Sequence, residues 1–248
     1  YDKAGIFIFG DRIYYASPSV EKDKKGNRLT SYLDFFSTKL DGSDTKKITY
    51  LTSNSFPFKF YQEGGKVYLI YINTAEGKVY NMDCGSGSKT MVLENYSATP
   101  ILAEDGYIYY NRDVYRDENK TQKYTYNLLR RARFIGSGDE EIKFSDGKSI
   151  TQEAFSVTLN EVMVIGGQTT LFYSKKSATD VDEEIILKDA HTFSYVIGAA
   201  SDKDIVQIEY TDLVYLSANS YLGVYNGKYY YVKYGEGVLP AQTPLFNK

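Results

Sequence analysis

The sequence predicts an all-β chain built from repeats of four strands. Its 26 tyrosines and 13 phenylalanines, with no tryptophan, favour strands because aromatic side chains suit half-buried pleated surfaces. Its apolar segments are short and are separated by turns rich in Gly, Asn and Asp. One hairpin design recurs along the chain: an apolar segment, a tight turn, and a second segment rich in apolar and aromatic residues.

The recurring hairpin is expected six times, and the first four copies are each followed by a second pair of strand candidates. In chain order, the hairpins are expected at residues 5–17, 58–72, 100–112, 155–167, 195–210 and 221–234. The strand pair after the first hairpin surrounds the turn Asp41-Gly42-Ser43, a composition typical of a tight connection. After the third hairpin, the segment 126–134 has the spacing of a short helix, but its neighbours favour a strand.

The spacing of the repeats predicts a β-propeller with five or six four-stranded blades. Equivalent positions are separated by 54, 41, 54 and 43 residues when they are taken as Tyr14, Tyr68, Tyr109, Met163 and Val206. A propeller blade takes about 40 to 50 residues. The chain is therefore expected to form one domain over residues 1–248, with blades at 5–52, 56–94, 98–147, 153–190 and 193–220 and a partial blade at 221–248.

The segments "DRIYYAS", "DGYIYYNR" and "STKLDGSDTKKIT" resemble the repeats of TolB-like propellers and of tyrosine-rich bacterial propellers of unknown function. The resemblance extends over most of residues 5–190, although the full DGS turn occurs only in the first blade. It implies a bacterial protein, secreted or at the cell surface as a lipoprotein, that binds a partner without catalysis.

Overall composition excludes several classes of function. A net charge of −3 and a pI near 5.4 provide no positive surface for nucleic acid. No apolar run is long enough to span a bilayer, and the single cysteine, Cys84, cannot form an internal disulfide. We expect a monomer. The start at Tyr1, without methionine, suggests a mature or partial product.

No motif in the sequence predicts catalysis, a metal site or a cofactor. The stretch "DCGSGSKT" at 83–90 lacks the glycines of a phosphate-binding loop and is expected to be a turn. The one histidine, His191, has no partners for a triad or a metal site. The carboxylates at 139–141 and 180–184 are expected in solvated turns, and the arginines at 130–133 on an exposed strand.

Repetition of the tyrosines in every blade indicates packing rather than a ligand platform. The tyrosine-rich segment 225–237 is accordingly expected to be the inner hairpin of the last blade. We expect a recognition or scaffolding propeller whose loops bind a protein or glycan partner, with the longest polar inserts at 16–31 and 111–123. If these loops hold a ligand, the candidate binding residues are Tyr110, Arg112 and Tyr115. Two alternatives remain, a carbohydrate-active enzyme with carboxylates at the channel mouth and the sensory ectodomain of a larger membrane protein.

Overall fold

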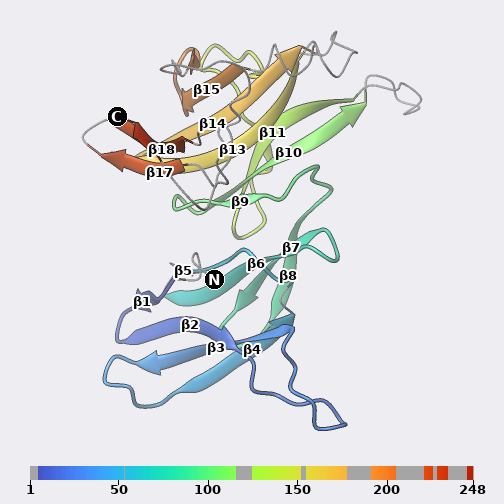
Figure 1. Ribbon diagram of the computed structural model, residues 1–248, viewed down its shortest axis with the longest axis vertical. Coiled ribbons are helices and arrows are strands. Elements are labelled where there is room, and N and C mark those ends of the chain that lie inside the picture. Colours follow the sequence, from blue (N-terminus) through green and yellow to red (C-terminus); the bar gives the residue numbers. More distant parts are fainter. Residues whose placement is uncertain are drawn as a thin grey trace. The chain divides into compact units, whose positions relative to one another are not determined.

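The computed structural model describes an all-β chain of antiparallel sheets (Figure 1). It describes residues 5–52, 54–115, 125–151, 155–177, 191–204, 221–225, 228–233 and 245–247. Over these ranges no α-helix occurs, and hence there is none that could cross a membrane.

Each of the first two sheets is a four-stranded meander in which consecutive strands are neighbours. The first sheet contains β1 (Phe7–Phe9), β2 (Arg12–Pro18), β3 (Tyr32–Lys39) and β4 (Lys46–Thr52). The second contains β5 (Phe58–Glu63), β6 (Lys66–Asn73), β7 (Lys78–Asp83) and β8 (Lys89–Glu94). Both agree with the strand pairs expected from the sequence, including the turn at Asp41-Gly42-Ser43, where Gly42 has a φ of 82°.

The remaining sheets follow the same order along the chain. The third contains β9 (Ile101–Leu102), β10 (Tyr107–Tyr115), β11 (Thr125–Arg133) and β12 (Glu140–Glu141). The fourth contains β13 (Phe155–Ile165), β14 (Gln168–Ser177), β15 (His191–Val196) and β16 (Lys203–Asp204). The fifth contains β17 (Tyr221–Tyr225), β18 (Lys228–Lys233) and β19 (Leu245–Asn247). Residues 126–133, which have the spacing of a short helix, therefore belong to the strand β11, as their neighbours indicated.

The fourth sheet differs from the sequence prediction. Residues 155–167 were expected to be a hairpin turning near Asn160, but they form the single strand β13 with a bulge between Leu159 and Glu161. The turn follows at Gly166 and Gly167, with φ values of 58° and 81°, because two consecutive glycines adopt positive φ without strain. Met163 is therefore on the first strand of this sheet and not on the second.

This shift also moves the boundary of the next expected blade. The fifth blade was placed at 193–220, beginning with a hairpin at 195–210, but β15 pairs with β14 and β16 pairs with β15. Residues 191–204 thus complete the fourth sheet. The hairpin expected at 221–234 is present as β17 and β18, and β19 adds a third strand to it from the segment after Gly235.

The contacts within the chain group its residues into two compact units. The first compact unit comprises residues 1–102, 106–110 and 131–140, and the second comprises 103–105, 111–130 and 141–248. The division passes through the third sheet instead of a linker. This is the behaviour of a repeat protein, in which each repeat contacts chiefly the repeats next to it in sequence.

The core of the first compact unit is aromatic. Between the first two sheets, the ring of Phe60 packs against those of Phe7, Tyr14, Phe35 and Phe58, with centroids 5.4–6.3 Å apart. A second cluster joins the second sheet to residues of the third, with Ile70, Ile72, Ile108, Tyr110 and Phe134 all buried. The tyrosines of these strands are therefore used for packing, as their repetition indicated.

In the second compact unit, tyrosine rings are buried while their hydroxyl groups are hydrogen-bonded. The Tyr173 hydroxyl donates to Asp202 Oδ2 at 2.6 Å, and the Tyr195 hydroxyl donates to the Lys143 carbonyl at 2.9 Å. Lys175 pairs with the same Asp202 and lies 4.6 Å from the centre of the Phe193 ring. These hydrogen bonds and the ion pair join strands of the fourth sheet to Asp202 and to the segment that follows β12.

Candidate functional site

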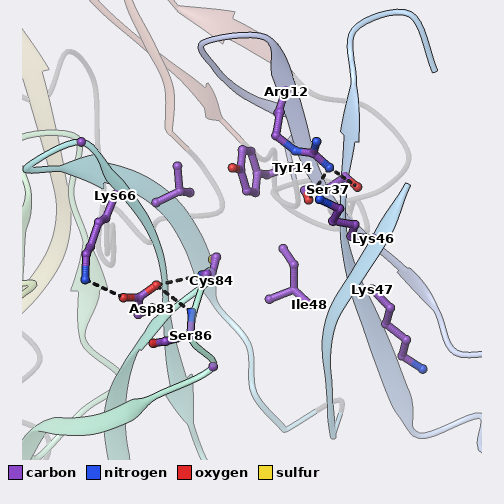
Figure 2. Close-up of a pocket in the computed structure, with 14 residues that line it drawn as sticks. Arg12, Tyr14, Ser37, Lys46, Lys47, Ile48, Lys66, Asp83, Cys84 and Ser86 are labelled. Atoms are coloured by element: carbon purple, nitrogen blue, oxygen red, sulfur yellow. Dashed lines mark hydrogen bonds and ion pairs between the residues drawn. The ribbon is translucent and has the colours of Figure 1, made fainter. Parts of the chain in front are cut away.

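A cleft of about 810 Å³ lies between the first and second sheets, within the first compact unit (Figure 2). The first sheet contributes residues of β2, β3 and β4, and the second contributes β6, the end of β7 and the turn after it. The lining residues are Arg12, Tyr14, Ser37, Lys46, Lys47, Ile48, Gly65, Lys66, Val67, Asp83, Cys84, Gly85, Ser86 and Gly87.

Strand register places the polar residues of the first sheet on the face that lines the cleft. Tyr14 pairs with Ser37, and Ser37 pairs with Lys46, so the three side chains form a row across the sheet. Arg12 precedes Tyr14 by two residues and therefore points to the same side. A bulge between Phe35 and Phe36 sets the register of β4.

Arg12 and Lys46 form one wall of the cleft around Asp44. One terminal nitrogen of Arg12 donates to Asp44 Oδ2 at 2.8 Å, and the other donates to Ser37 Oγ at 3.0 Å and to the Asp44 carbonyl at 2.8 Å. Lys46 Nζ lies 3.2 Å from Asp44 Oδ2. The hydrogen bonds from Arg12 and Lys46 lower the pKa of Asp44, so this carboxylate stays ionised. The guanidinium of Arg12 is thereby held in one orientation.

The opposite wall is the turn that begins at Asp83. Asp83 Oδ1 accepts hydrogen bonds from the backbone N–H groups of Gly85 at 2.8 Å and Ser86 at 3.2 Å, while Oδ2 lies 3.1 Å from Lys66 Nζ. The N–H groups of Gly85 and Ser86, together with Lys66, lower the pKa of Asp83 to about 2. The stretch that superficially resembles a phosphate-binding loop is therefore a turn between β7 and β8, as the sequence predicted, and its N–H groups serve Asp83.

Apolar groups shared with the core form the floor of the cleft. Tyr14, Ile48, Val67 and Cys84 belong to the cluster between the first two sheets. The Cys84 amide donates to the Val67 carbonyl at 2.9 Å, which fixes the side chain against β6. Burial raises the pKa of Cys84 to about 12, so its thiol is neutral at physiological pH and is a poor nucleophile.

Lys47 also lines the cleft, but its ammonium group points away from it (Figure 2). Its ammonium nitrogen lies 2.6 Å from Glu21 Oε1 and 3.0 Å from Asp34 Oδ1. Lys47 pairs with Phe36 across the sheet, on the face opposite Ser37. The cationic groups that face the cleft are therefore those of Arg12, Lys46 and Lys66.

Two of the residues predicted to bind a ligand, Tyr110 and Arg112, are not among the residues that line this cleft. Tyr110 is 1% exposed, and its hydroxyl donates to Asp139 Oδ1 at 2.6 Å, so the ring packs in the core. Arg112 lies half-buried on β10. Tyr115 ends β10, but its side chain lies outside the described residues, as does most of the insert at 111–123.

Two of the arginines singled out in the sequence have partners in the first compact unit. Arg131 pairs with Glu140 at 2.7 Å and lies over the Tyr107 ring, and Arg133 lies 3.5 Å from Glu63. The carboxylates at 180–184 lie outside the described residues. His191 begins β15. Among the described residues, no group of three or more acidic, cysteine or histidine side chains is placed to hold a metal ion.

No family model matches the sequence, and no curated protein matches it. Solved structures are similar. The β-propeller domain of the Trilobed protease from Pyrococcus furiosus is 12% identical with a TM-score of 0.47, and the match covers 92% of this chain and 61% of that one. TolB from Acinetobacter baumannii is 13% identical with a TM-score of 0.40, covering 96% and 53%. An oligogalacturonate lyase in complex with manganese is 12% identical with a TM-score of 0.37, covering 78% and 50%.

The chain thus spans about half to three fifths of the length of these proteins. Over the described residues, four of its five sheets are four-stranded antiparallel meanders in sequence order, which is the strand arrangement of a propeller blade. The chain has an all-β fold, and its structural neighbours are β-propellers.

Proposed function

We propose that the chain is a non-catalytic recognition domain of a bacterial secreted or cell-surface protein, and that it binds a protein or glycan partner at the cleft between its first two sheets. The bacterial setting is the one implied by the resemblance of its repeats to TolB-like and tyrosine-rich propellers. The cleft is the part of the proposal that the geometry supports. It combines an apolar floor with polar walls, the usual composition of a binding site.

One observation carries the choice of binding over catalysis: Asp83 and Cys84, which line the cleft, are each held in one protonation state at neutral pH. A general acid or base works best with a pKa near the operating pH. Asp83, with a pKa near 2, remains ionised, and Cys84, with a pKa near 12, remains protonated. These groups can hold a ligand, but they are poorly suited to move a proton at neutral pH.

The alternative of a carbohydrate-active enzyme finds no support in this cleft. Glycoside hydrolysis requires two carboxyl groups on either side of the scissile bond. Of the described residues that line the cleft, Asp83 alone carries a carboxylate, and its two oxygens are occupied by backbone amides and Lys66. The described lining residues therefore do not provide the pair of carboxyl groups that a retaining or an inverting glycosidase needs.

A steric block of the cleft tests the proposal without changing its charge. Ser86 is exposed and lines the cleft, whereas Ser88 is exposed in the same turn and does not line it. The wild-type chain, Ser86→Trp and Ser88→Trp would be screened on glycan arrays and on displayed random peptides. We expect a ligand that binds the wild type and Ser88→Trp equally and binds Ser86→Trp at least about tenfold more weakly. Failure of both screens, or turnover of the bound ligand, would contradict the proposal.

A further inference from the structure

The cationic groups in the cleft have unused capacity to bind a ligand. Lys46 and Lys66 stand on opposite walls, and each side chain is 64% exposed. Each ammonium group has three donors and one carboxylate partner among the ion pairs of the structure, Asp44 for Lys46 and Asp83 for Lys66. A ligand with acceptor atoms can therefore be bound from both walls without breaking either ion pair.

The charges of the cationic lining residues and of their carboxylate partners do not cancel. Arg12, Lys46 and Lys66 are cationic, while Asp44 and Asp83 are ionised carboxylates, which leaves one positive charge in excess. Lys47 does not change this balance, because its ammonium group is on the other face of the sheet with Asp34 and Glu21. An anionic group on the ligand is complementary to this site, and a carboxylate accepts strong hydrogen bonds from ammonium groups.

The floor of the cleft distinguishes a peptide from a sugar. Ile48, Val67 and the neutral thiol of Cys84 present an apolar surface between the charged walls. Sugar rings stack on exposed aromatic faces, but Tyr14 is the one aromatic residue among the described lining residues, and it is only 9% exposed. An apolar side chain on the floor, beside an acidic side chain between the lysines, matches both features.

We propose that the ligand of this cleft is an acidic peptide segment, in which an apolar side chain contacts Ile48 and Val67 and a neighbouring carboxylate lies between Lys46 and Lys66. This inference rests on the proposed recognition function and specifies the chemistry of its ligand. It predicts binding that weakens as ionic strength rises, because exposed charge pairs are screened by salt.

The test is selection of random dodecapeptides, displayed on phage, against the 248-residue chain. The double variant Lys46→Glu, Lys66→Glu reverses both cations. Because both side chains are exposed, this variant should fold. Lys24→Glu, Lys25→Glu makes the same change of charge at exposed positions in the loop at 19–31 and is the matched control. We expect selected peptides enriched in Asp or Glu beside an apolar residue, with affinity reduced at least about tenfold by the cleft variant and little by the control.

The outcomes separate this inference from the recognition function on which it rests. If the selected peptides are neutral or basic, the proposal of an acidic-peptide ligand is wrong, although the chain remains a recognition domain. The same conclusion follows if acidic peptides bind both double variants equally. A glycan that binds the wild type and is blocked by Ser86→Trp would overturn the proposal of an acidic-peptide ligand in the same way. If no peptide and no glycan binds the wild-type chain, both proposals fail.

Discussion

Lys66 Nζ lies 3.1 Å from Asp83 Oδ2, so that the first residue of β6 is joined to the last residue of β7 at one end of the second sheet. The other carboxylate oxygen of Asp83 accepts the N–H groups of Gly85 and Ser86. One side chain therefore determines both the shape of the turn and the position of a cation in the cleft.

This arrangement predicts how stability depends on pH. The pKa of Asp83 falls from 3.8 to about 2 on folding. The ionised Asp83 carboxylate therefore contributes fully to the free energy of unfolding above about pH 4, and this contribution is lost as the pH falls toward 2. Asp83→Asn should therefore lower the melting temperature at pH 5 to 7, and its difference from the wild type should shrink below pH 4. Thermal unfolding followed by circular dichroism measures this, with Asp11→Asn as a control for the loss of one charge. A difference that stays constant down to pH 2 would contradict the assigned pKa.

Lys47 and Asp34 provide the second prediction, because the Asp34 side chain is only 2% exposed. Burial raises the pKa of Asp34, but the hydrogen bonds from Lys47, Ser19 and Val20 outweigh burial, so the pKa lies below its ordinary value. Lys47→Met would leave this carboxylate buried without its cation. We expect the free energy of unfolding in urea to fall by about 3 kcal/mol.

The neighbouring Lys46→Met is the control for Lys47→Met, since Lys46 is exposed and pairs with the exposed Asp44. Its effect on unfolding should be small, because exposed ion pairs contribute little to stability. Equal effects of the two substitutions would show that the burial of Asp34 is not what makes Lys47 important.

The third prediction concerns the aromatic core. Phe60 is 1% exposed and contacts four aromatic rings, so Phe60→Ala should lower the free energy of unfolding by about 4 kcal/mol, from lost burial and from the cavity left behind. Tyr50, which is 52% exposed, is the control, and Tyr50→Ala should cost much less. Chemical denaturation distinguishes the two. A Phe60→Ala variant as stable as Tyr50→Ala would mean that the first two sheets do not pack through this residue.

The fourth prediction uses the single cysteine as a probe. Burial raises the pKa of Cys84 from 9.0 to about 12, so at pH 8 the thiolate, which is the reactive form, should be about a thousandfold less populated than for an unperturbed thiol. Iodoacetamide should therefore modify the native chain very slowly and the urea-unfolded chain at an ordinary rate. Equal rates in the two states would contradict the buried, protonated thiol and would weaken the case for a non-catalytic cleft.

Local patterns predicted much of the fold. The turns at Asp41-Gly42-Ser43 and at 83–90 were foreseen because glycine and short polar side chains mark tight connections. The fourth sheet differs from the prediction because Asn160 resembles a turn residue, whereas the positive φ values needed for the turn are adopted by Gly166 and Gly167. The bulge that accommodates Asn160 depends on pairing with β14, which the segment itself does not reveal.

The cleft could not be foreseen in the same way. The polar side chains of the cleft come from strands of two sheets. Strand register and the packing of one sheet on the other bring together Arg12, Ser37, Lys46, Lys66 and Asp83. Each of these residues is unremarkable in its own segment. Long polar inserts and repeated aromatic residues are the signals that the sequence offers for a binding site. They point to Tyr110, which is buried in the structure.

The measurement that tests the account most directly is a titration of the isotope-labelled chain with the best acidic peptide from the selection, followed through backbone amide chemical shifts. We predict that the shifts change at residues 65–67 and 83–87 and around Lys46, and that these changes disappear in the Lys46→Glu, Lys66→Glu variant. Binding with shifts that leave these residues unchanged, or that persist in the variant, would contradict the assignment of the cleft as the recognition site.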